Sequence, residues 1–599
     1  MSIREMISEK RKARKRWQET RFPYDKTQLN SITAKLKQLL NSDKNQGIQT
    51  YLKNLNATAA TDYSLWKATK KLKRPILIQS PIRKKDNTWA KNDSERVETF
   101  AEHLHEVFVP NSFQGDSKKM DEVLHLLNRT HQLDLPISKF TKSEVTQAIR
   151  KLNQHKAPGY DLITAKILRE LPEEAIIYLT QLYNAIIKRG FVPQQWKVAQ
   201  VIMILKPGKR AEDVKSYRPI SLLPIPSKVL EILFLKRLMP IIEKNQIIPN
   251  YQFGFRQKHS TIEQIHRLVE KINTTFEQKK YCSAIFLDIS QAFDRVWHEG
   301  LLYKIKKTLP INYYVFIRSY LNNRHFFVKQ NDKASKLYTI QAGVPQGSVL
   351  GPILYLMYTS DLPTTEGVVI GTFADDTAAL AIDDNPAAAS TKLQRCLKNI
   401  SQWLKNWRIQ PNENKSIHVT FTIRRETCPP VHLNGVQIPQ ANEAKYLGLY
   451  LDRRLTWRKH IFTKRKAMGI QLRKLYWLMC QKSQLSLENK LLLYKCILKP
   501  IWTYGVQLWG TTANSNIEIL QRFQSKILRM ITNSPWYITN NRLHHDLDIP
   551  TVKEEIKTRV KAYKTRLQNH PNKLASHLMN RKKIFYRLKR RIPQDLITV

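Results

Sequence analysis

The chain has 599 residues, of which 42% are hydrophobic, and a formal net charge of +51 from 100 Lys and Arg against 49 Asp and Glu. This length allows roughly three to five domains, and the hydrophobic content excludes a largely disordered chain. The excess of positive charge favours a polyanionic partner, for which nucleic acid is the first choice.

The cysteines and apolar stretches exclude other classes of protein. Five scattered cysteines form no CxxC pair, which excludes a disulfide framework and a zinc knuckle and indicates a reducing compartment. The N-terminal stretch MSIREMISEKRKARKRW has no apolar segment of the secretory type. The longest apolar stretch, SVLGPILYLMY, is too short to span a bilayer. We therefore expect a soluble protein of the nucleus or cytosol with no membrane partner.

The first 150 residues predict helices and loops. Residues 1–75 are basic and predict a helical N-terminal extension, with the run KRKARKR at residues 10–16. That run is typical of a nuclear signal or a phosphate-binding patch, and equally of a solvated helix face. Residues 76–150 predict a linker or extension with one helix starting near Ser94. From residue 139, two helical patterns flank the Pro-Gly turn of KAPGYD.

The central segments alternate between strand and helix patterns. QWKVAQVIMILKPGK predicts a strand that ends in a turn, and KSYRPISLLP predicts its hairpin partner. YCSAIFLDIS predicts a strand that ends at Asp288, and QAFDRVWHEGLLYKIKKTL predicts the amphipathic helix after it. GVPQGSVLGPILYLMYTSDL predicts a Gly-Pro loop that opens into a buried helix.

Two adjacent acids lie at the tip of a predicted hairpin. GTFADDTAAL predicts strand, turn and strand, with Asp375 and Asp376 in the turn, and a helix and the strand KSIHVTFT follow. The order of elements predicts a βαββαβ arrangement, a four-stranded antiparallel sheet with helices on one face. This topology would bring Asp288 beside the two acids.

Three converging carboxylates form an oxygen-rich site suited to Mg²⁺. Two such ions about 4 Å apart can activate a hydroxyl and stabilise a leaving group in in-line phosphoryl transfer. A second pair, Asp383 and Asp384, precedes Asn-Pro, and we interpret it as acids of a turn.

The motifs resemble those of reverse transcriptases of non-LTR (LINE-type) retrotransposons of the jockey-like clade. FLDISQAFDRVWH resembles motif A, GVPQGSVLGP motif B, FADD motif C, WLKNWRIQPNENKS motif D and KYLGLYLD motif E. ILKPGK with SYRPISLL resembles the fingers motifs, and QFGFRQKHST the segment before motif A. KAPGYD, ILKPIWTYGVQLWG and ITNSPWYITN extend the resemblance over most of the chain.

The resemblance implies an α+β right-hand polymerase with fingers, a βαββαβ palm and a helical thumb, and with helical N- and C-terminal extensions. The fingers and the start of the palm would occupy residues 151–270, and the palm with motifs A to E residues 271–455. The reverse transcriptase domain as a whole would span about 185–455. Residues 456–535 would be the thumb and 536–599 a basic C-terminal segment.

The resemblance also implies roles for individual residues. Asp288, Asp375 and Asp376 would be the catalytic metal ligands. Lys415 would be the general acid toward pyrophosphate, although a solvated lysine is an equal alternative. Phe293 would be the steric gate against ribonucleotides, with helix-start packing as the alternative. We expect Asp294 to pair with the helix N-terminus.

The remaining site residues fall into two groups. The residues that would bind the nucleotide, in addition to Phe293, are Lys206, Arg218, Gln346 and Gly347. Those that would form the primer grip are Tyr446, Leu447 and Gly448.

The implied activity is RNA-directed DNA polymerisation, primed by a DNA 3′-OH at a nicked target and supported by two Mg²⁺ ions, with Mn²⁺ as a substitute. The implied partners are the RNA template, the DNA primer or target, dNTPs and the element's own RNA-binding protein. The implied location is the nucleus, after a cytoplasmic ribonucleoprotein stage.

Three alternatives remain open: an intron-type reverse transcriptase or maturase, a decayed nucleic-acid-binding relic, and a two-metal nuclease. No endonuclease domain is legible before residue 150, so we expect a polymerase-only fragment or a decayed copy.

Overall fold

The chain folds into two compact units. The computed structural model describes residues 2–58, 61, 63–73, 80–112, 117–130, 136–580, 587–588 and 590–597. The first unit comprises Met1–Leu77, Thr456–Ala562 and Arg591–Val599, and the second comprises Ile78–Leu455 and Tyr563–Arg590. All residues predicted for the catalytic, nucleotide and primer-grip sites belong to the second unit.

A four-stranded antiparallel sheet forms the centre of the second unit. Its strands are β5 (Tyr281–Leu287), β9 (Val368–Phe373), β10 (Asp376–Asp383) and β11 (Ile417–Phe421), in the order β11-β5-β10-β9. Every pairing is antiparallel. The strands expected around Asp288 and around the two acids are therefore confirmed.

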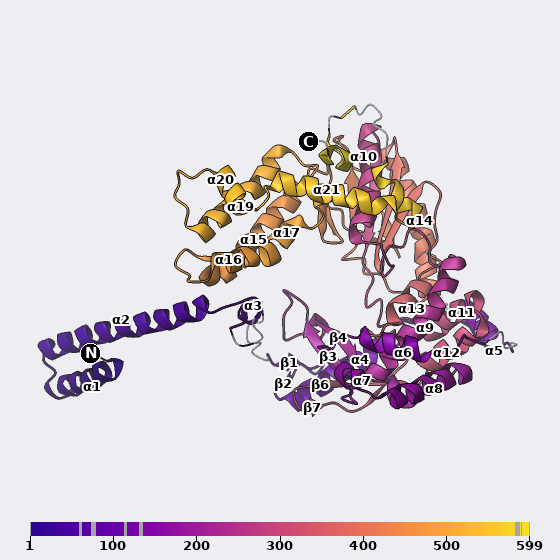
Figure 1. The fold of residues 1–599 in the computed structure, drawn as a ribbon. Coiled ribbons are helices and arrows are strands. Elements are labelled where there is room, and N and C mark those ends of the chain that lie inside the picture. The colour runs from indigo at the N-terminus through magenta and orange to yellow at the C-terminus, as the bar shows by residue number, and fades with distance from the viewer. Residues whose placement is uncertain are drawn as a thin grey trace. The chain divides into compact units, whose positions relative to one another are not determined.

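Helices cover both faces of this sheet (Figure 1). On one face, Ser390 of α14 (Pro386–Asn406) places its Oγ 3.4 Å from the Oγ of Ser283 in β5. On the other face, a Cβ added to Gly371 would lie 2.3 Å from the side chain of Gln264 in α10 (Thr261–Glu277). The expectation of helices on one face was wrong because it left out α10, which precedes β5 in the chain. With both faces covered, every residue of β5 is buried.

A second sheet combines strands from distant parts of the sequence. The expected hairpin of β3 (Val198–Leu205) and β4 (Tyr217–Leu222) is confirmed. A strand that was not predicted from the sequence, β6 (Arg324–Gln330), pairs in parallel with β3. Two short strands, β7 (Lys333–Ala334) and β8 (Tyr338–Ile340), pair with β6 in turn.

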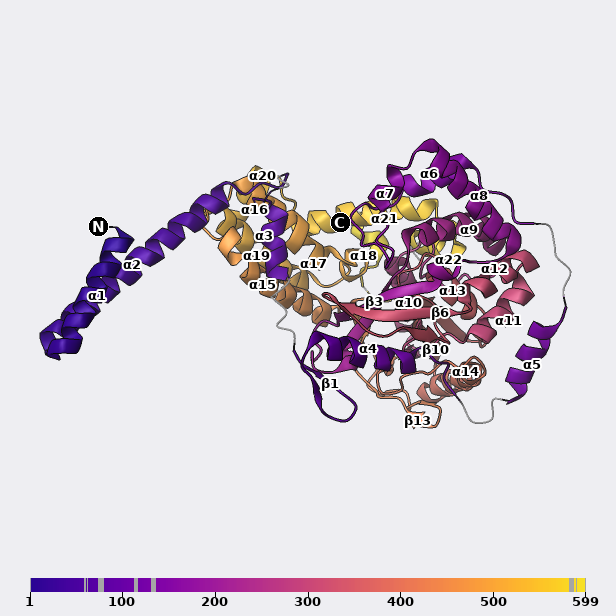
Figure 2. The same ribbon diagram turned by 90° about the horizontal axis from the view of Figure 1, so that it is seen from below.

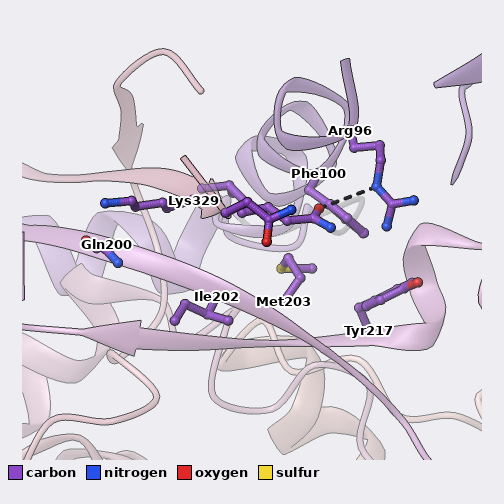
Figure 3. Close-up of a pocket in the computed structure, with 10 residues that line it drawn as sticks. Arg96, Phe100, Gln200, Ile202, Met203, Tyr217 and Lys329 are labelled. Carbon is purple, nitrogen blue, oxygen red and sulfur yellow. Dashed lines mark hydrogen bonds between the residues drawn. The ribbon is translucent and has the colours of Figure 1, made fainter. Parts of the chain in front are cut away.

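The helix α4 (Asp93–Val107) packs on this second sheet and leaves a cavity of about 320 Å³ (Figure 3). Arg96, which is 4% exposed, reaches from α4 to Gln330 and donates a 3.4 Å hydrogen bond from its Nε. Phe100 packs edge-on against Tyr217, with ring centroids 4.8 Å apart. The helix expected to start near Ser94 is confirmed: it begins at Asp93, and Asn92 caps it by accepting from the amide of Glu95. Helix α4 thus completes the core of the sheet.

The other helices of the second unit pack around the two sheets (Figure 2). They are α5 (Ser117–Asn128), α6 (Lys142–Arg150), α7 (Ala165–Arg169), α8 (Glu173–Arg189), α9 (Ile225–Lys244), α11 (His298–Thr308), α12 (Ile311–Leu321), α13 (Gly351–Tyr358) and α22 (Lys573–Ser576). The helix expected directly after Asp288 starts only at His298, because residues 289–297 form turns. The helix expected after the Gly-Pro loop is confirmed as α13, which is almost wholly buried.

Three two-stranded hairpins complete the second unit. They are β1 (Ile82–Arg83) with β2 (Trp89–Ala90), β12 (His432–Leu433) with β13 (Val436–Gln437), and β14 (Glu443–Tyr446) with β15 (Leu449–Asp452).

The regular structure described in the first unit is helical. Its helices are α1 (Ile3–Thr20), α2 (Pro23–Lys53), α3 (Leu65–Lys73), α15 (Arg458–Met479), α16 (Leu487–Leu493), α17 (Lys499–Thr503), α18 (Val506–Trp509), α19 (Asn514–Thr532) and α20 (Asn540–Asp546). Helix α21 (Val552–Gln568) begins in this unit and ends in the second. All five cysteines of the chain are free, as expected. Among the described residues, no helix has the length and apolar character needed to cross a membrane.

Candidate active site

The three predicted aspartates meet at one end of the four-stranded sheet. Thr377 of β10 lies opposite Leu287 of β5, so the same register places Asp376 opposite Asp288. Directly opposed residues of an antiparallel pair have Cβ atoms roughly 5 Å apart. Asp375 lies in the two-residue turn that joins β9 to β10, next to Asp376. The topology therefore brings the three carboxylates together.

Mutual repulsion and burial act on these carboxylates in the same direction. Burial raises the pKa of Asp375, and the charge of Asp288 raises it further, whereas the charge of Arg218 opposes the shift. Burial, then the charges of Asp375 and Asp288, raise the pKa of Asp376 to about 6. Like charges held together in a desolvated place favour protonation or a bound cation.

Basic groups from two other segments surround the carboxylates. The Nζ of Lys415, between α14 and β11, lies 3.9 Å from the Oδ2 of Asp288. Burial lowers the pKa of Lys206, and the nearby charges of Arg218 and Lys415 lower it further. Lys206 also donates a 2.9 Å hydrogen bond to the carbonyl of Lys215. The predicted phosphate-binding residues thus share one electrostatic environment with the acids.

The donor set fits hard cations that keep part of their water shell. Among the described residues, no group of three or more His, Cys, Asp or Glu side chains is arranged as a cage that could hold a metal ion by itself. Mg²⁺ does not need such a cage, because it binds through one or two carboxylates together with water and substrate phosphates. The side chain of Asp288 is 45% exposed, so water and substrate oxygens can reach it, which matches that mode of binding.

The predicted motif B loop is fixed against β4 by close backbone contacts. Gly347 has φ of +122°, and a Cβ there would lie 2.5 Å from the carbonyl oxygen of Ser221, so only glycine fits. The amide of Ser221 donates to the carbonyl of Gln346 at 2.8 Å. The side chain of Gln346 in turn donates to Asp294 at 2.7 Å.

Asp294 therefore does not act as expected. It accepts from Gln346 instead of pairing with the N-terminus of α11, whose N-cap position is Trp297. Burial raises the pKa of Asp294 to about 6. The expectation failed because the helix begins four residues after Asp294 and not beside it.

One buried acid was missed by the sequence analysis. Glu231 of α9 is 1% exposed and accepts from the amides of Val349 at 2.6 Å and Leu350 at 3.2 Å. It thereby satisfies amide groups at the start of α13 and fixes the end of the motif B loop. A single acid inside the apolar run KVLEILFL was the available signal, since a buried charge needs partners.

Phe293 lies in the turns before α11, beside the acidic site. Its ring stacks on Tyr355 of α13 with centroids 4.4 Å apart, and Phe255 meets it edge-on at 5.8 Å. Packing at a helix start does not describe this position, because α11 begins five residues later. Its role as a sugar gate remains a prediction.

The predicted primer grip forms the hairpin β14–β15. Leu447 and Gly448 make its two-residue turn and both have positive φ, the backbone of a type I′ turn. Tyr446 is 3% exposed, and its ring lies 5.2 Å from that of Phe286. The side chain of Tyr446 therefore serves packing, and the turn is the part of the hairpin that a primer could meet.

Comparisons with known proteins agree with this geometry. The family "Reverse transcriptase (RNA-dependent DNA polymerase)" matches residues 204–451. A probable RNA-directed DNA polymerase from transposon X-element of Drosophila melanogaster is 43% identical over 598 residues, 99% of this chain and 66% of that protein. The RNA-directed DNA polymerase from mobile element jockey of the same species is 39% identical over 611 residues, 99% of this chain and 67% of that protein. The chain thus spans about two thirds of the length of these curated relatives.

A second family, "MCM3-like, winged helix domain", matches residues 90–156. The described residues of that span do not share one core. Phe100 of α4 packs with β3 and β6, whereas Val145 of α6 packs in a different cluster with Tyr183 of α8. The match therefore does not correspond to a separate compact domain.

Proposed function

Because the chain belongs to the RNA-directed DNA polymerases of non-LTR mobile elements, we propose that it copies element RNA into DNA by two-metal nucleotidyl transfer. The observation that carries the proposal is the convergence of Asp288, Asp375 and Asp376 at one sheet end, with raised pKa values for the two adjacent acids. A reverse transcriptase domain implies a right-hand polymerase fold.

Within that fold, we assign the four-stranded sheet to the palm and the sheet of β3, β4 and β6 to the fingers. The helices α15 to α19 of the first unit would be the thumb. Support comes from the order of the elements and from the acids at the tip of the β9–β10 hairpin.

Asp288, Asp375 and Asp376 would hold two Mg²⁺ ions, which Mn²⁺ could replace. When bound, such ions activate the primer 3′-OH and stabilise the pyrophosphate leaving group. The chain's own contribution is to hold the three carboxylates adjacent, at a cost in repulsion that the metal charge offsets.

Other residues would orient the nucleotide. Arg218 would bind the triphosphate through its planar fork and Lys206 as a point charge. Lys415, 3.9 Å from Asp288, would donate a proton to the leaving pyrophosphate.

The sugar and the base would be read by a second group of residues. Gln346 and Gly347 would form the floor under the templating pair, and the ring of Phe293 would exclude a ribose 2′-OH. Leu447 and Gly448 would position the primer end, with Tyr446 fixing their hairpin from within the palm.

A basic groove of the first unit would bind the template–primer duplex. The groove between α15 and α19 has a volume of about 1140 Å³ and combines basic with apolar side chains. Its lining residues are Lys459, Phe462, Thr463, Arg465, Lys466, Ile519, Arg522, Phe523 and Lys526. Five cations along one groove match a phosphate backbone, and affinity for the duplex should fall steeply with salt.

The proposal extends to the setting of the reaction. We propose priming by a nicked DNA target in the nucleus, after a cytoplasmic ribonucleoprotein stage with the element's own RNA-binding protein. The net charge of +51 and the basic run at residues 10–16 support a nucleic-acid partner and nuclear import.

Primer extension on poly(rA)/oligo(dT) with dTTP and Mg²⁺ tests the proposal. We expect the wild type to incorporate dTTP and Asp375→Asn to lose activity by about 1,000-fold or more, because one metal ligand is removed. Asp383→Asn, on the same strand and equal in chemistry, is the matched control. A wild type that incorporates nothing would favour the decayed relic, and activity that survives Asp375→Asn would overturn the site.

A further inference from the structure

One buried amide side chain grips the turn that carries the catalytic pair. The Oε1 of Gln252 accepts from the backbone amide of Ala374 at 2.9 Å, and its Nε2 donates to the carbonyl of the same residue at 3.3 Å. The Oε1 also accepts from the amide of Gly254 at 2.8 Å. Gln252 is 4% exposed, so water competes little for these bonds. Both polar backbone groups of Ala374 are therefore held by one side chain.

The backbone around Gln252 is attached to the same hairpin. The amide of Phe253 donates to the carbonyl of Thr372 at 3.0 Å, and the amide of Thr372 donates to Tyr251 at 3.1 Å. A Cβ on Gly254 would lie 2.2 Å from the amide nitrogen of Ala374, so any other residue would displace the turn. The segment Tyr251–Gly254 thus forms an isolated parallel bridge with β9, between Gln252 and Thr372.

The turn needs such support because of its backbone conformation. Ala374 has φ of +58°, a left-handed conformation that a Cβ disfavours. Asp375 follows directly, so a change in the peptide of Ala374 would reorient the Asp375 carboxylate. A left-handed alanine persists only where its surroundings impose it. The amide of Gln252 supplies that constraint from outside the hairpin.

A further contact fixes the position of Gln252 itself. The Nη1 of Arg256 donates to the carbonyls of Pro249 and Gln252, both at 3.2 Å. Arg256 thereby fixes the backbone of the loop that carries Gln252. The residues of the motif QFGFR therefore act together on the turn. The side chain of Gln252 binds the peptide of Ala374, Gly254 allows the two backbones to approach closely, and Arg256 holds the loop of Gln252 in place.

We propose that Gln252 is a positioning residue for Asp375 and Asp376, acting through the peptide of Ala374. This inference rests on the proposed polymerase function. Gln252 touches neither substrate nor metal in this role. It holds the acids in the arrangement that lets them share two cations, so its loss should lower the rate of nucleotide transfer more than the binding of the duplex.

Gln252→Met tests the proposal, because methionine keeps the length of the side chain and removes all three of its hydrogen bonds, two to Ala374 and one to Gly254. We expect kcat for dTTP to fall about 10- to 100-fold, as misplaced catalytic groups do, and half-saturating Mg²⁺ to rise. The dissociation constant of the primer–template duplex should stay within about twofold. The exposed Gln257→Met in the same loop is the matched control and should keep wild-type kcat.

A second change separates positioning from packing. Glycine adopts a left-handed φ without penalty. Adding Ala374→Gly to Gln252→Met should therefore recover at least about fivefold of the lost kcat, which loss of core packing would not allow.

The outcomes distinguish the two hypotheses. An inactive wild type overturns the polymerase proposal and this one with it. An active wild type with undiminished kcat in Gln252→Met, or a loss that Ala374→Gly does not recover, overturns the positioning role alone.

Discussion

Strand β10 carries an Asp-Asp pair at each end, and the two pairs have opposite electrostatics. At its start, Asp375 and Asp376 face Asp288, and their pKa values are raised. At its end, Asp383 lies 2.6 Å from the Nζ of Lys392, and Asp384 lies 3.3 Å from the Nζ of Lys280. The hydrogen bond from Lys392, then one from a backbone amide, lower the pKa of Asp383.

The difference shows that the dipeptide carries no function by itself. At the far end, each carboxylate has a lysine partner, so its charge is already balanced and stabilises the local fold slightly. At the near end, Asp288 after β5 adds a third acid, so negative charge is in excess there. A surplus of negative charge inside a strongly basic protein indicates a place kept for cations.

The largest effect should come from removing metal. With excess EDTA, we expect dTTP incorporation to fall by about 1,000-fold or more, because the proposed two-metal reaction requires cations bound between the near-end acids. Mg²⁺ should restore activity in the wild type and equally in Asp383→Asn. The measurement is initial rate against free Mg²⁺. Extension that persists in EDTA would contradict a cation site between the near-end acids.

A smaller effect, on the choice between deoxyribonucleotides and ribonucleotides, should follow from removing the ring of Phe293 beside the near end of β10. Phe293→Ala should reduce discrimination against rUTP relative to dTTP by about 10-fold or more, because the clash with the 2′-OH is lost. The ratio of kcat/KM for the two nucleotides measures it. Unchanged discrimination would assign the ring to packing with Tyr355 and Phe255 alone. Phe421→Ala, in β11 at the end of the four-stranded sheet away from the acids, is the control for general loss of aromatic packing.

Neutralising an aspartate should change the melting temperature in opposite directions at the two ends of β10. The raised pKa of Asp376 means that its ionisation opposes folding as pH rises from about 4 to about 6. In metal-free protein at pH 7.5, Asp376→Asn should therefore raise the melting temperature by about 1–3 °C, allowing for solvent screening. At pH 5 the gain should shrink.

Asp383→Asn should lower the melting temperature by a similar or smaller amount in the same buffer. Its pKa is depressed, so its contribution is present above the unfolded-state value and is lost when the charge is removed. Shifts of the same sign in both variants would remove the contrast between the ends of β10.

The smallest effect should come from Lys392→Met, which breaks one surface ion pair at the far end. Such pairs contribute about 0.2–1 kcal/mol, so unfolding in urea should change by no more than this. The rate of primer extension should be unchanged, since Lys392 lies at the opposite end of the strand from the carboxylates.

Much of the second unit could be predicted from local patterns. Apolar runs rich in β-forming residues, bounded by turn residues, predict the strands β3, β4, β5, β9, β10 and β11. The acids at their ends then follow from topology. The parallel pairing of β6 with β3 could not be predicted, because the local sequence RHFFVKQ contains no signal for the strand with which it pairs, more than 100 residues earlier.

The supporting residues were harder to predict than the carboxylates. Gln252 and Glu231 act through backbone groups of distant loops, and a hydrogen bond to a peptide leaves no pattern in the partner's sequence. Asp294 was assigned to a helix end because the start of α11 was placed too early. Roles that depend on burial and on backbone geometry become visible only in three dimensions.

The return of the chain to the second unit sets an order of assembly during synthesis. Glu263 of α10 is fully buried, and its ion-pair partner is Arg566, 303 residues later. His266 of the same helix contacts Tyr563 at 3.1 Å. Until the ribosome has made the helices between α10 and Arg566, Glu263 lacks its ion-pair partner. The ion pair of Glu263 can therefore form only after Arg566 has been synthesised, and chains truncated before Arg566 should be less stable and more readily removed by proteases.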